Sequence, residues 1–405
     1  MFGCFFMRKI IRITVSVIAV FCAVIMGFVA AGSYILPDRI VTYNNGKTRI
    51  SSFYTCKAGG ALAPVDYQSA SPKTKTYSVF GIVPVKEVKV SSSQTPYVLV
   101  SGEVFGIKLY TDGVIVIGSQ NVDLGNGKTV NPAERAGLET GDIIVSVNNI
   151  KVYSTYDVSS LLNENNGESY TIKIKRDGRY KTFVLTPVYS PREGCYKAGL
   201  WVRDSTAGIG TLTFYNENAG TFASLGHQIN DIDTKELMPL LEGEAVSASV
   251  TKIQRASAGS TGSLWCSFEN HTLGRLIDNS ESGLYGAYVQ LSDKAKEYPV
   301  ASKQEAVRGK AQIISTISGK QPEAFDIEIT RISYTRENEQ RDMVFKVTDK
   351  RLLKEAGGIV QGMSGSPIIQ NGKLIGAVTH VIVNNPEKGY AIFAQTMYEK
   401  SQRLN

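Results

Sequence analysis

The chain has 405 residues, and its 42% hydrophobic and 20% charged content is typical of about two to three folded domains and excludes a wholly disordered protein. The net charge of +7 comes without an Arg-rich helix or an aromatic RNA-binding motif, so we expect no nucleic-acid partner. Five cysteines, none in a Cys-x-x-Cys pair or at metal-like spacing, exclude a disulfide scaffold and predict no metal or other cofactor.

The N-terminal segment predicts a membrane anchor. Residues 13–36 are almost all apolar, and crossing a hydrocarbon core takes about 20 helical residues. Basic residues precede this run, so the positive-inside rule predicts a cytoplasmic tail, residues 1–12, with the bulk of the chain outside. A cleaved signal peptide is the alternative, because Val29-Ala30-Ala31 is an acceptable cleavage signature. The length of the apolar run favours the uncleaved anchor.

The next residues predict a stalk and then a compact unit. Residues 37–95 are rich in Ser, Thr, Lys, Gly and Pro, a composition that buries little surface and is typical of a linker. Residues 96–190 combine apolar strand segments with a short helix closed by Gly137 and a second helical stretch at 156–163. We expect this unit to fold as a separate domain.

The last part, residues 195–400, alternates short apolar strands with Gly and polar turns. Segments 210–214, 310–314 and 373–378 are examples, and strands do not alternate with long helices. The pattern predicts an antiparallel barrel or sandwich, and about 200 residues are enough for two small barrels packed together. The chain as a whole is therefore expected to be mainly β.

The run Gly362-Met363-Ser364-Gly365-Ser366-Pro367 is the sharpest chemical signal. A serine between glycines can sit on a tight turn with its hydroxyl exposed, although the same residues also suit an ordinary turn. Small neighbours let backbone N–H groups converge where negative charge develops on an attacked carbonyl. The N–H groups of Gly362 and Ser364 are the natural oxyanion-hole pair.

A serine nucleophile needs a base, and the chain has only three histidines. His227 is the best candidate, because small residues precede it, acids follow it, and its distance before Ser364 is typical of two-barrel proteases. His271 lies in a polar loop segment, and His380 is too close in sequence to Ser364. Spacing alone leaves four candidate acids to orient the base, which are Asp231, Asp233, Asp278 and Asp349.

The flanks of the serine run resemble chymotrypsin-like serine proteases. After Pro367 the residues 368–380 read as a strand, a turn and a returning strand that would line the substrate cleft. In such enzymes the acid falls between His and Ser, which would suit Asp278. The resemblance places the substrate pocket at Gly358, Thr379, His380 and Val381, and this set predicts a narrow, uncharged pocket.

A more specific resemblance is to the stage IV sporulation protein B peptidases. It is carried by Leu225-Gly226-His227-Gln228-Ile229-Asn230-Asp231-Ile232-Asp233-Thr234, by the GGIVQGMSGSP run at 357–367, and by Thr379-His380-Val381. The catalytic motifs of that family fall here on His227, Asp349 and Ser364. The segment 255–266 departs from the family's usual form, which leaves the role of one loop undecided.

The unit at 96–190 resembles the PDZ domains of bacterial proteases. A peptide adds to the edge of such a domain as an extra strand, and backbone N–H groups hold its terminal carboxylate. The resemblance places this peptide groove at Gly106, Ile107, Lys108 and Leu109. The expected ligand is a peptide, with the protein's own chain among the candidates.

The family resemblance implies a membrane-anchored serine endopeptidase that faces the space between the forespore and mother-cell membranes. It would cleave itself near the N-terminus, which would allow secretion of the remainder. It would also cleave a membrane-bound regulatory protein complex, and so trigger intramembrane proteolysis and sigma-factor activation during sporulation. The competing hypothesis is a PDZ-bearing adaptor with an inert protease domain, and a cysteine peptidase using Cys266 has no supporting histidine pattern.

Overall fold

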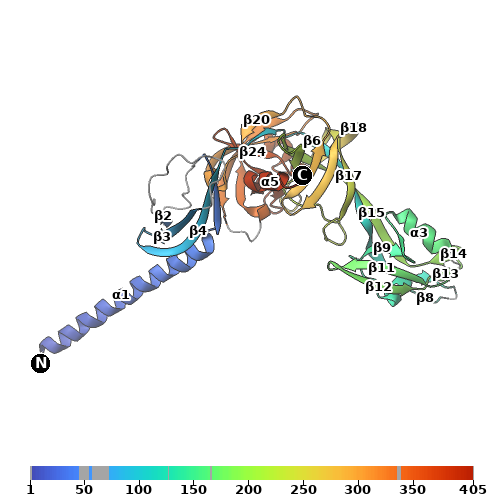
Figure 1. The fold of residues 1–405 in the computed structure, drawn as a ribbon, viewed down its shortest axis with the longest axis horizontal. Coiled ribbons are helices and arrows are strands. Elements are labelled where there is room, and N and C mark those ends of the chain that lie inside the picture. Colours follow the sequence, from blue (N-terminus) through green and yellow to red (C-terminus); the bar gives the residue numbers. More distant parts are fainter. Residues whose placement is uncertain are drawn as a thin grey trace.

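The computed structural model describes residues 2–44, 54–56, 73–125, 127–164, 167–334 and 339–404. The fold is mainly β, as the sequence predicts. Figure 1 shows an elongated molecule with helix α1 (Phe2–Ile35) projecting from one end, two barrels in the middle and a smaller unit at the opposite end.

The segment between α1 and the barrels is a small sheet, and the stalk expected over 37–95 is wrong for these strands. The sheet has the order β1-β4-β3-β2, with strands β1 (Arg39–Tyr43), β2 (Tyr54–Cys56), β3 (Lys73–Val79) and β4 (Val83–Ser93). Its core includes Tyr54, Tyr77 and Val88, and it packs against the end of α1 through Leu36. Because only alternate residues of a strand face the core, a segment that is polar on average can still bury one face.

The first barrel is a ring of six strands in the order β6-β17-β18-β19-β16-β15, closed by the pairing of β6 with β15. Two further strands, β5 (Tyr97–Val100) and β20 (Lys296–Pro299), extend the sheet beside β15. Phe105, Leu212 and Phe222 are among its buried core residues. The six strands are β6 (Val104–Ser119), β15 (Leu200–Asn216), β16 (Thr221–Ser224), β17 (Leu240–Gln254), β18 (Ser263–Ser280) and β19 (Gly283–Tyr288).

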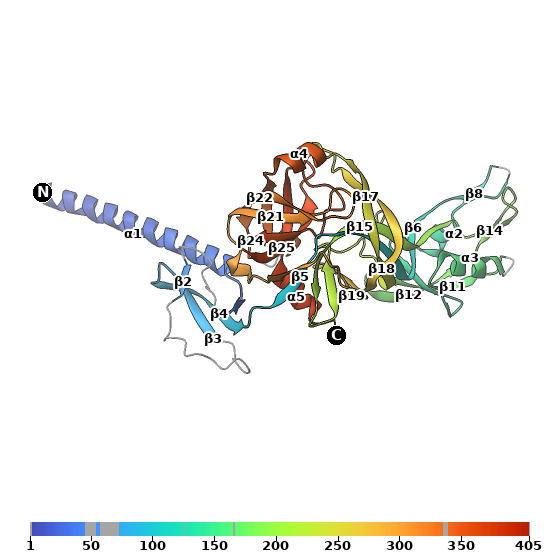
Figure 2. The same cartoon turned by 90° about the horizontal axis from the view of Figure 1, so that it is seen from above.

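The smaller unit is inserted between β6 and β15, which both run from the barrel into it (Figure 2). The early part of β6 pairs with the late part of β15 in the barrel, and the outer parts pair again at Val116 and Val202. The unit has its own core around Val114, Ile144 and Ile172. Its remaining elements are β7 (Val122–Asp123), β8 (Thr129–Val130), α2 (Pro132–Ala136), β9 (Ile143–Val147), β10 (Ile150–Lys151), α3 (Thr155–Glu164), β11 (Tyr170–Arg176), β12 (Arg179–Leu185), β13 (Val188–Ser190) and β14 (Cys195–Lys197).

This insertion corrects the predicted boundaries of 96–190 and 195–400. Strand β5 and the first half of β6 belong to the barrel, so the barrel region begins near residue 97 and is interrupted by the inserted unit. Local patterns predicted the elements of the unit, including α2 with its left-handed Gly137 cap. They could not show that β6 pairs with strands about 90 or more residues away, because such pairing leaves no local signal.

The second barrel closes on itself in the order β21-β22-β23-β26-β25-β24. Its strands are β21 (Gly309–Ser315), β22 (Glu323–Ile332), β23 (Met343–Val347), β24 (Pro367–Gln370), β25 (Lys373–Val381) and β26 (Lys388–Phe393). Short helices border it, namely η1 (Lys303–Glu305), η2 (Glu339–Arg341), α4 (Lys350–Ala356) and α5 (Ala394–Ser401). The prediction of packed barrels is confirmed.

Candidate active site

The loop that carries Ser364 enters β24 at the seam between the two barrels. Its flanking glycines adopt φ angles of +100° at Gly362 and +95° at Gly365, which favour glycine. A Cβ atom on Gly365 would lie 2.0 Å from the carbonyl oxygen of Thr211. Only glycine therefore lets this loop press against β15 of the first barrel.

Two buried threonines of β15 hold the loop from the other barrel. Thr211 donates its hydroxyl to the Gly362 carbonyl at 2.8 Å, and its N–H to the Ser364 carbonyl at 2.8 Å. Thr213 donates to the Gly365 carbonyl at 2.7 Å. Neither threonine was predicted from the sequence, although two hydroxyls at alternate positions of an apolar strand are a signal for buried polar contacts.

The Ser364 hydroxyl is half-buried and donates to the Thr379 carbonyl oxygen at 2.7 Å, and among the described residues no hydrogen bond joins it to His227. Within the described residues, no acceptor takes the N–H of Gly362 or of Ser364. Both N–H groups therefore remain available beside the Ser364 hydroxyl, which is what an oxyanion hole requires.

His227 reaches the same seam from the end of β16 through a left-handed turn. Leu225 and Gly226 have φ angles of +64° and +70°, and a Cβ on Gly226 would lie 3.0 Å from the Thr379 side chain. The Nδ1 atom of His227 lies 2.7 Å from the Gln228 carbonyl oxygen. Because a carbonyl only accepts, Nδ1 carries the proton and Nε2 keeps the lone pair that a general base needs.

A second imidazole packs against the first. The rings of His227 and His380 have centroids 4.6 Å apart and planes 35° apart. Burial lowers the pKa of His227, although its hydrogen bond to Gln228 opposes this shift. Burial first, and then the charges of His227 and Arg341, lower the pKa of His380 to about 4. Both rings are therefore neutral at pH 7, and His227 is in the form that can accept a proton.

Ser364 and His227 line one cleft of about 450 Å³. Of the predicted pocket residues, Thr379, His380 and Val381 line this cleft, whereas Gly358 does not. A Cβ on Gly358 would lie 2.2 Å from the Pro386 carbonyl oxygen, so Gly358 serves close packing. The divergent loop after β17 contributes Thr261, and further apolar lining comes from Ile107, Ile209, Ile229, Ile359, Val360 and Val383.

The structure does not bring Asp349 together with these groups. Asp349 is the N-cap of α4, where its Oδ1 accepts from the N–H groups of Arg351 and Leu352 at 2.9 and 3.0 Å. Its Oδ2 lies 3.4 Å from the Asp326 nitrogen. Among the described residues, no hydrogen bond joins it to His227, and it does not line the cleft. The family resemblance alone supports its catalytic assignment.

The other candidate acids are engaged elsewhere. Asp231 and Asp233 both form ion pairs with Arg203, which lies on β15 where that strand enters the inserted unit. Asp278 forms an ion pair with Lys400 of α5 at 3.1 Å. None of the three lines the cleft. In the described residues the group that orients His227 is thus the Gln228 carbonyl, which a search for acidic side chains could not find.

The predicted peptide groove at Gly106, Ile107, Lys108 and Leu109 is corrected by the strand pairing. Residues 106–109 pair with β15 on one side and with β17 on the other, so they have no free edge for an added strand. A groove of about 720 Å³ lies instead in the inserted unit, beside α3. Its lining includes Val158 and Leu162 of α3 and the residues 198–202 that lead into β15.

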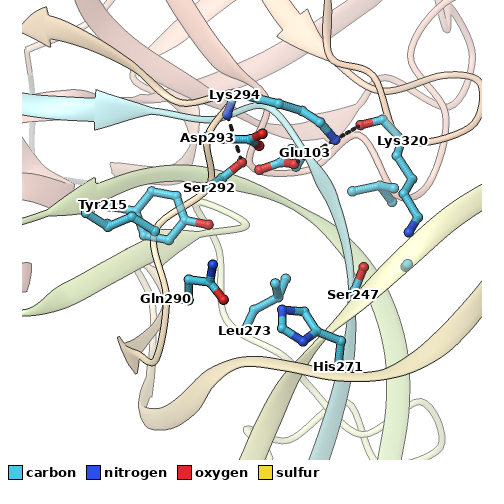
Figure 3. Close-up of a pocket in the computed structure, with 13 residues that line it drawn as sticks. Glu103, Tyr215, Ser247, His271, Leu273, Gln290, Ser292, Asp293, Lys294 and Lys320 are labelled. Carbon is cyan, nitrogen blue, oxygen red and sulfur yellow. Dashed lines mark hydrogen bonds and ion pairs between the residues drawn. The ribbon is translucent and has the colours of Figure 1, made fainter.

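A second polar pocket lies at the first barrel, away from Ser364 (Figure 3). It contains Ser247, His271 and Asp293, the residue types of a hydrolase triad. Ser247, however, donates its hydroxyl to Glu269, and in the described part of the chain no hydrogen bond joins Ser247 to His271. Lys294 in the same pocket is bound to Glu103. Ser247 and Lys294 are thus engaged with carboxylates, and this pocket lies outside the residues that the peptidase motifs single out.

Comparison with known families agrees with this geometry. The profile of the SpoIVB peptidase S55 family matches residues 194–398, about half of the chain, and includes both Ser364 and His227. The chain belongs to this peptidase family. A PDZ domain profile matches residues 130–176, which lie in the inserted unit.

Individual relatives cover less of the chain. A candidate zinc metalloprotease of Clostridium acetobutylicum is 29% identical over 114 residues, 27% of this chain and 34% of that protein. One from Staphylococcus aureus strain N315 is 37% identical over 62 residues, 15% of this chain and 14% of that protein. The chain thus spans a third or less of these relatives, and its described residues contain no cluster of three or more His, Cys, Asp or Glu that could hold a metal.

Two solved structures are similar in part. The PDZ domain of an SdrC-like protein from Listeria monocytogenes has a TM-score of 0.18 at 18% identity and covers 22% of this chain and 87% of that one. The active form of the Rv3671c protease from Mycobacterium tuberculosis has a TM-score of 0.29 at 15% identity and covers 49% of this chain and 75% of that one. Both scores are low.

Proposed function

We propose that the protein is a serine endopeptidase with Ser364 as nucleophile and His227 as general base. The observation that carries this proposal is the convergence, in one cleft, of the serine hydroxyl, an imidazole whose Nδ1 is held by a carbonyl, and two N–H groups that have no acceptor among the described residues.

The geometry supports the usual two-step acyl transfer. As Ser364 Oγ attacks the substrate carbonyl, its proton leaves the Thr379 carbonyl and passes to Nε2 of His227. The N–H groups of Gly362 and Ser364 would receive the developing oxyanion. The imidazolium then donates its proton to the leaving amine, and a water molecule repeats the sequence to release the acyl group. The Gln228 carbonyl would hold the ring throughout.

The substrate class follows from the cleft wall. Val381 and the neighbouring isoleucine and valine side chains give an apolar lining. A small apolar residue before the cut, such as Ala or Val, would fit it better than Arg or Lys, with discrimination of only about 1–3 kcal/mol per methylene.

Anchoring through α1 would place this chemistry outside the cytoplasm. The apolar part of the helix, Ile11–Ile35, has a mean hydropathy of 2.7 and is long enough to span a membrane. The alternative cleavage site at Val29-Ala30-Ala31 lies where the helix packs against the folded sheet, since Val29 contacts its core. Packing of this segment favours an uncleaved anchor over a signal peptide.

The proposed substrates are the protein's own chain and a membrane-bound regulatory complex on the same side of the membrane. Family membership supports sporulation signalling, in which such a cut would activate intramembrane proteolysis and a sigma factor. The groove beside α3 would bind a peptide of a partner or of the chain itself. The proposed location is the forespore membrane, with the peptidase facing the space between the two membranes.

The test compares Ser364→Ala with Ser257→Ala, a matched change at an exposed serine. In full-length protein in nanodiscs, Ser364→Ala should abolish labelling by a fluorophosphonate probe and lower peptide cleavage at least about 10³-fold, with an unchanged melting temperature. Ser257→Ala should behave like the unmodified protein. An unlabelled but folded native protein would instead indicate an inert PDZ-bearing adaptor.

A further inference from the structure

The turn between β3 and β4 exposes apolar side chains at its tip. Phe80 is 56% exposed and Ile82 is 81% exposed. Phe80 also has a φ angle of +50°, in the left-handed region that bulky residues rarely adopt. Backbone strain combined with exposed apolar surface points to a functional contact that the isolated chain does not supply.

The tip lies against the apolar helix and not at its end. The rings of Phe80 and Phe28 meet edge to face, with centroids 5.6 Å apart. Phe28 precedes the last helical residue, Ile35, by seven positions, which corresponds to about 10 Å of helix. The turn therefore reaches back along the stretch that we propose to lie in the bilayer. Figures 1 and 2 both show the sheet beside this end of α1.

The sheet packs directly against α1, and this packing holds the turn beside the helix. Tyr54 donates its hydroxyl to the Phe28 carbonyl at 2.9 Å. A Cβ on Gly32 would lie 2.5 Å from the Tyr54 ring, so the helix and the sheet are in direct contact at this glycine. The turn consequently cannot move away from α1 without breaking the core around Tyr54 and Leu36.

Polar groups gather a short way along β4 from the turn, at Lys86. Lys86 donates to the Leu36 carbonyl at 2.8 Å and forms an ion pair with Asp38 at 2.8 Å, where α1 ends. Lys86 follows Ile82 by four positions, about 13 Å along an extended strand. The apolar tip at residues 80–82 and the charged Lys86 are therefore spaced like the acyl region and the headgroup region of a lipid leaflet.

We infer that the β3–β4 turn, residues 80–82, inserts into the outer leaflet beside α1 and gives the protease a second attachment to the lipid surface. Phe80 and Ile82 enter the acyl region, and Lys86 stays at headgroup level. Two attachments fix the orientation of the sheet against the bilayer, which a single helix would leave free to rotate. This inference rests on the proposed anchoring through α1.

Tryptophan quenching in nanodiscs of brominated phosphatidylcholine tests the insertion. The native tryptophans are first removed in the full chain as Trp201→Phe and Trp265→Phe, and single probes are then introduced. Ile82→Trp reports the turn, Phe21→Trp reports α1, and Tyr156→Trp on α3 is the control, since Tyr156 is 77% exposed in the distant inserted unit.

We expect the bromolipid to quench the Ile82→Trp and Phe21→Trp probes at least about twofold more than the Tyr156→Trp probe. Quenching at Phe21→Trp without quenching at Ile82→Trp would overturn the insertion and leave the anchor intact. If neither probe is quenched, both the insertion of the turn and the anchoring through α1 are overturned. None of these readings depends on peptidase activity.

Discussion

The two barrels each close from six strands, but they draw these strands from very different stretches of the chain. The second barrel closes within residues 309–393, from six strands that no other domain interrupts. The first barrel needs β6 and β15, which are separated by the whole inserted PDZ unit. The proposed nucleophile, Ser364, lies on the contiguous barrel and the proposed base, His227, on the interrupted one, so the proposed active site depends on both kinds of closure.

Truncation gives the largest contrast between the barrels. A chain that begins at residue 195, the boundary suggested by sequence, lacks β5 and β6, and β6 is a partner of both β15 and β17. We expect this chain to be unfolded or inactive, whereas a chain beginning at residue 97 should fold and cleave peptides. Circular dichroism and fluorophosphonate labelling would measure both properties. A folded, active 195–405 fragment would contradict the need for β6.

Replacing the inserted unit provides the matched control for that experiment. A short Gly-Ser turn in place of residues 113–203 leaves the barrel portions of β6 and β15 in place. We expect this shortened protein to fold and to retain labelling at Ser364. Failure to fold would show that the PDZ unit stabilises the barrel beyond simply connecting its strands.

A smaller effect is expected at the contact between the barrels. Thr211→Val keeps the shape of the side chain but removes the donor to the buried Gly362 carbonyl, at a cost of roughly 1–3 kcal/mol. Because we propose that Gly362 supplies one oxyanion N–H, we expect kcat to fall about tenfold or more with little change in KM. The control is Thr330→Val, which removes a similar bond to Val344 away from the cleft. Equal kinetics for the two variants would argue against a positioning role for Thr211.

The smallest effect is expected within the second barrel alone, at Asp349. Asparagine caps helices about as well as aspartate, so Asp349→Asn should keep both the fold and peptidase activity within a few-fold of the unmodified protein. Asp349→Ala should lower the unfolding free energy by about 1 kcal/mol. Thermal melts and kcat/KM would be measured for both. A thousandfold loss of activity in a normally stable Asp349→Asn protein would restore this residue as the third catalytic group.

The sequence predicted the features that depend on neighbouring residues and missed those that depend on distant strand pairing or on backbone groups. The GMSGSP run specified the Ser364 loop because its glycines serve the local φ angles, and the turn before His227 is equally local. The PDZ boundaries and peptide groove were missed because β6 serves two units at once. The orienting partner of His227 was missed because a backbone carbonyl has no signature in the side-chain sequence. The N-terminal sheet was missed because its buried residues alternate with Lys, Ser and Thr.

The strand order of the N-terminal sheet determines whether self-cleavage in this region would release the peptidase from the membrane helix. A cut between β2 and β3 would leave α1, β1 and β2 on one fragment and the peptidase on the other. Strand β1 would still pair with β4, and β2 with β3, so the two fragments would stay associated through the sheet. A cut after β4, in residues 94–96 ahead of β5, would instead leave all four strands of the sheet with the membrane helix and would separate no paired strands. The position of a cut thus distinguishes a nicked enzyme that stays tethered from one that diffuses away.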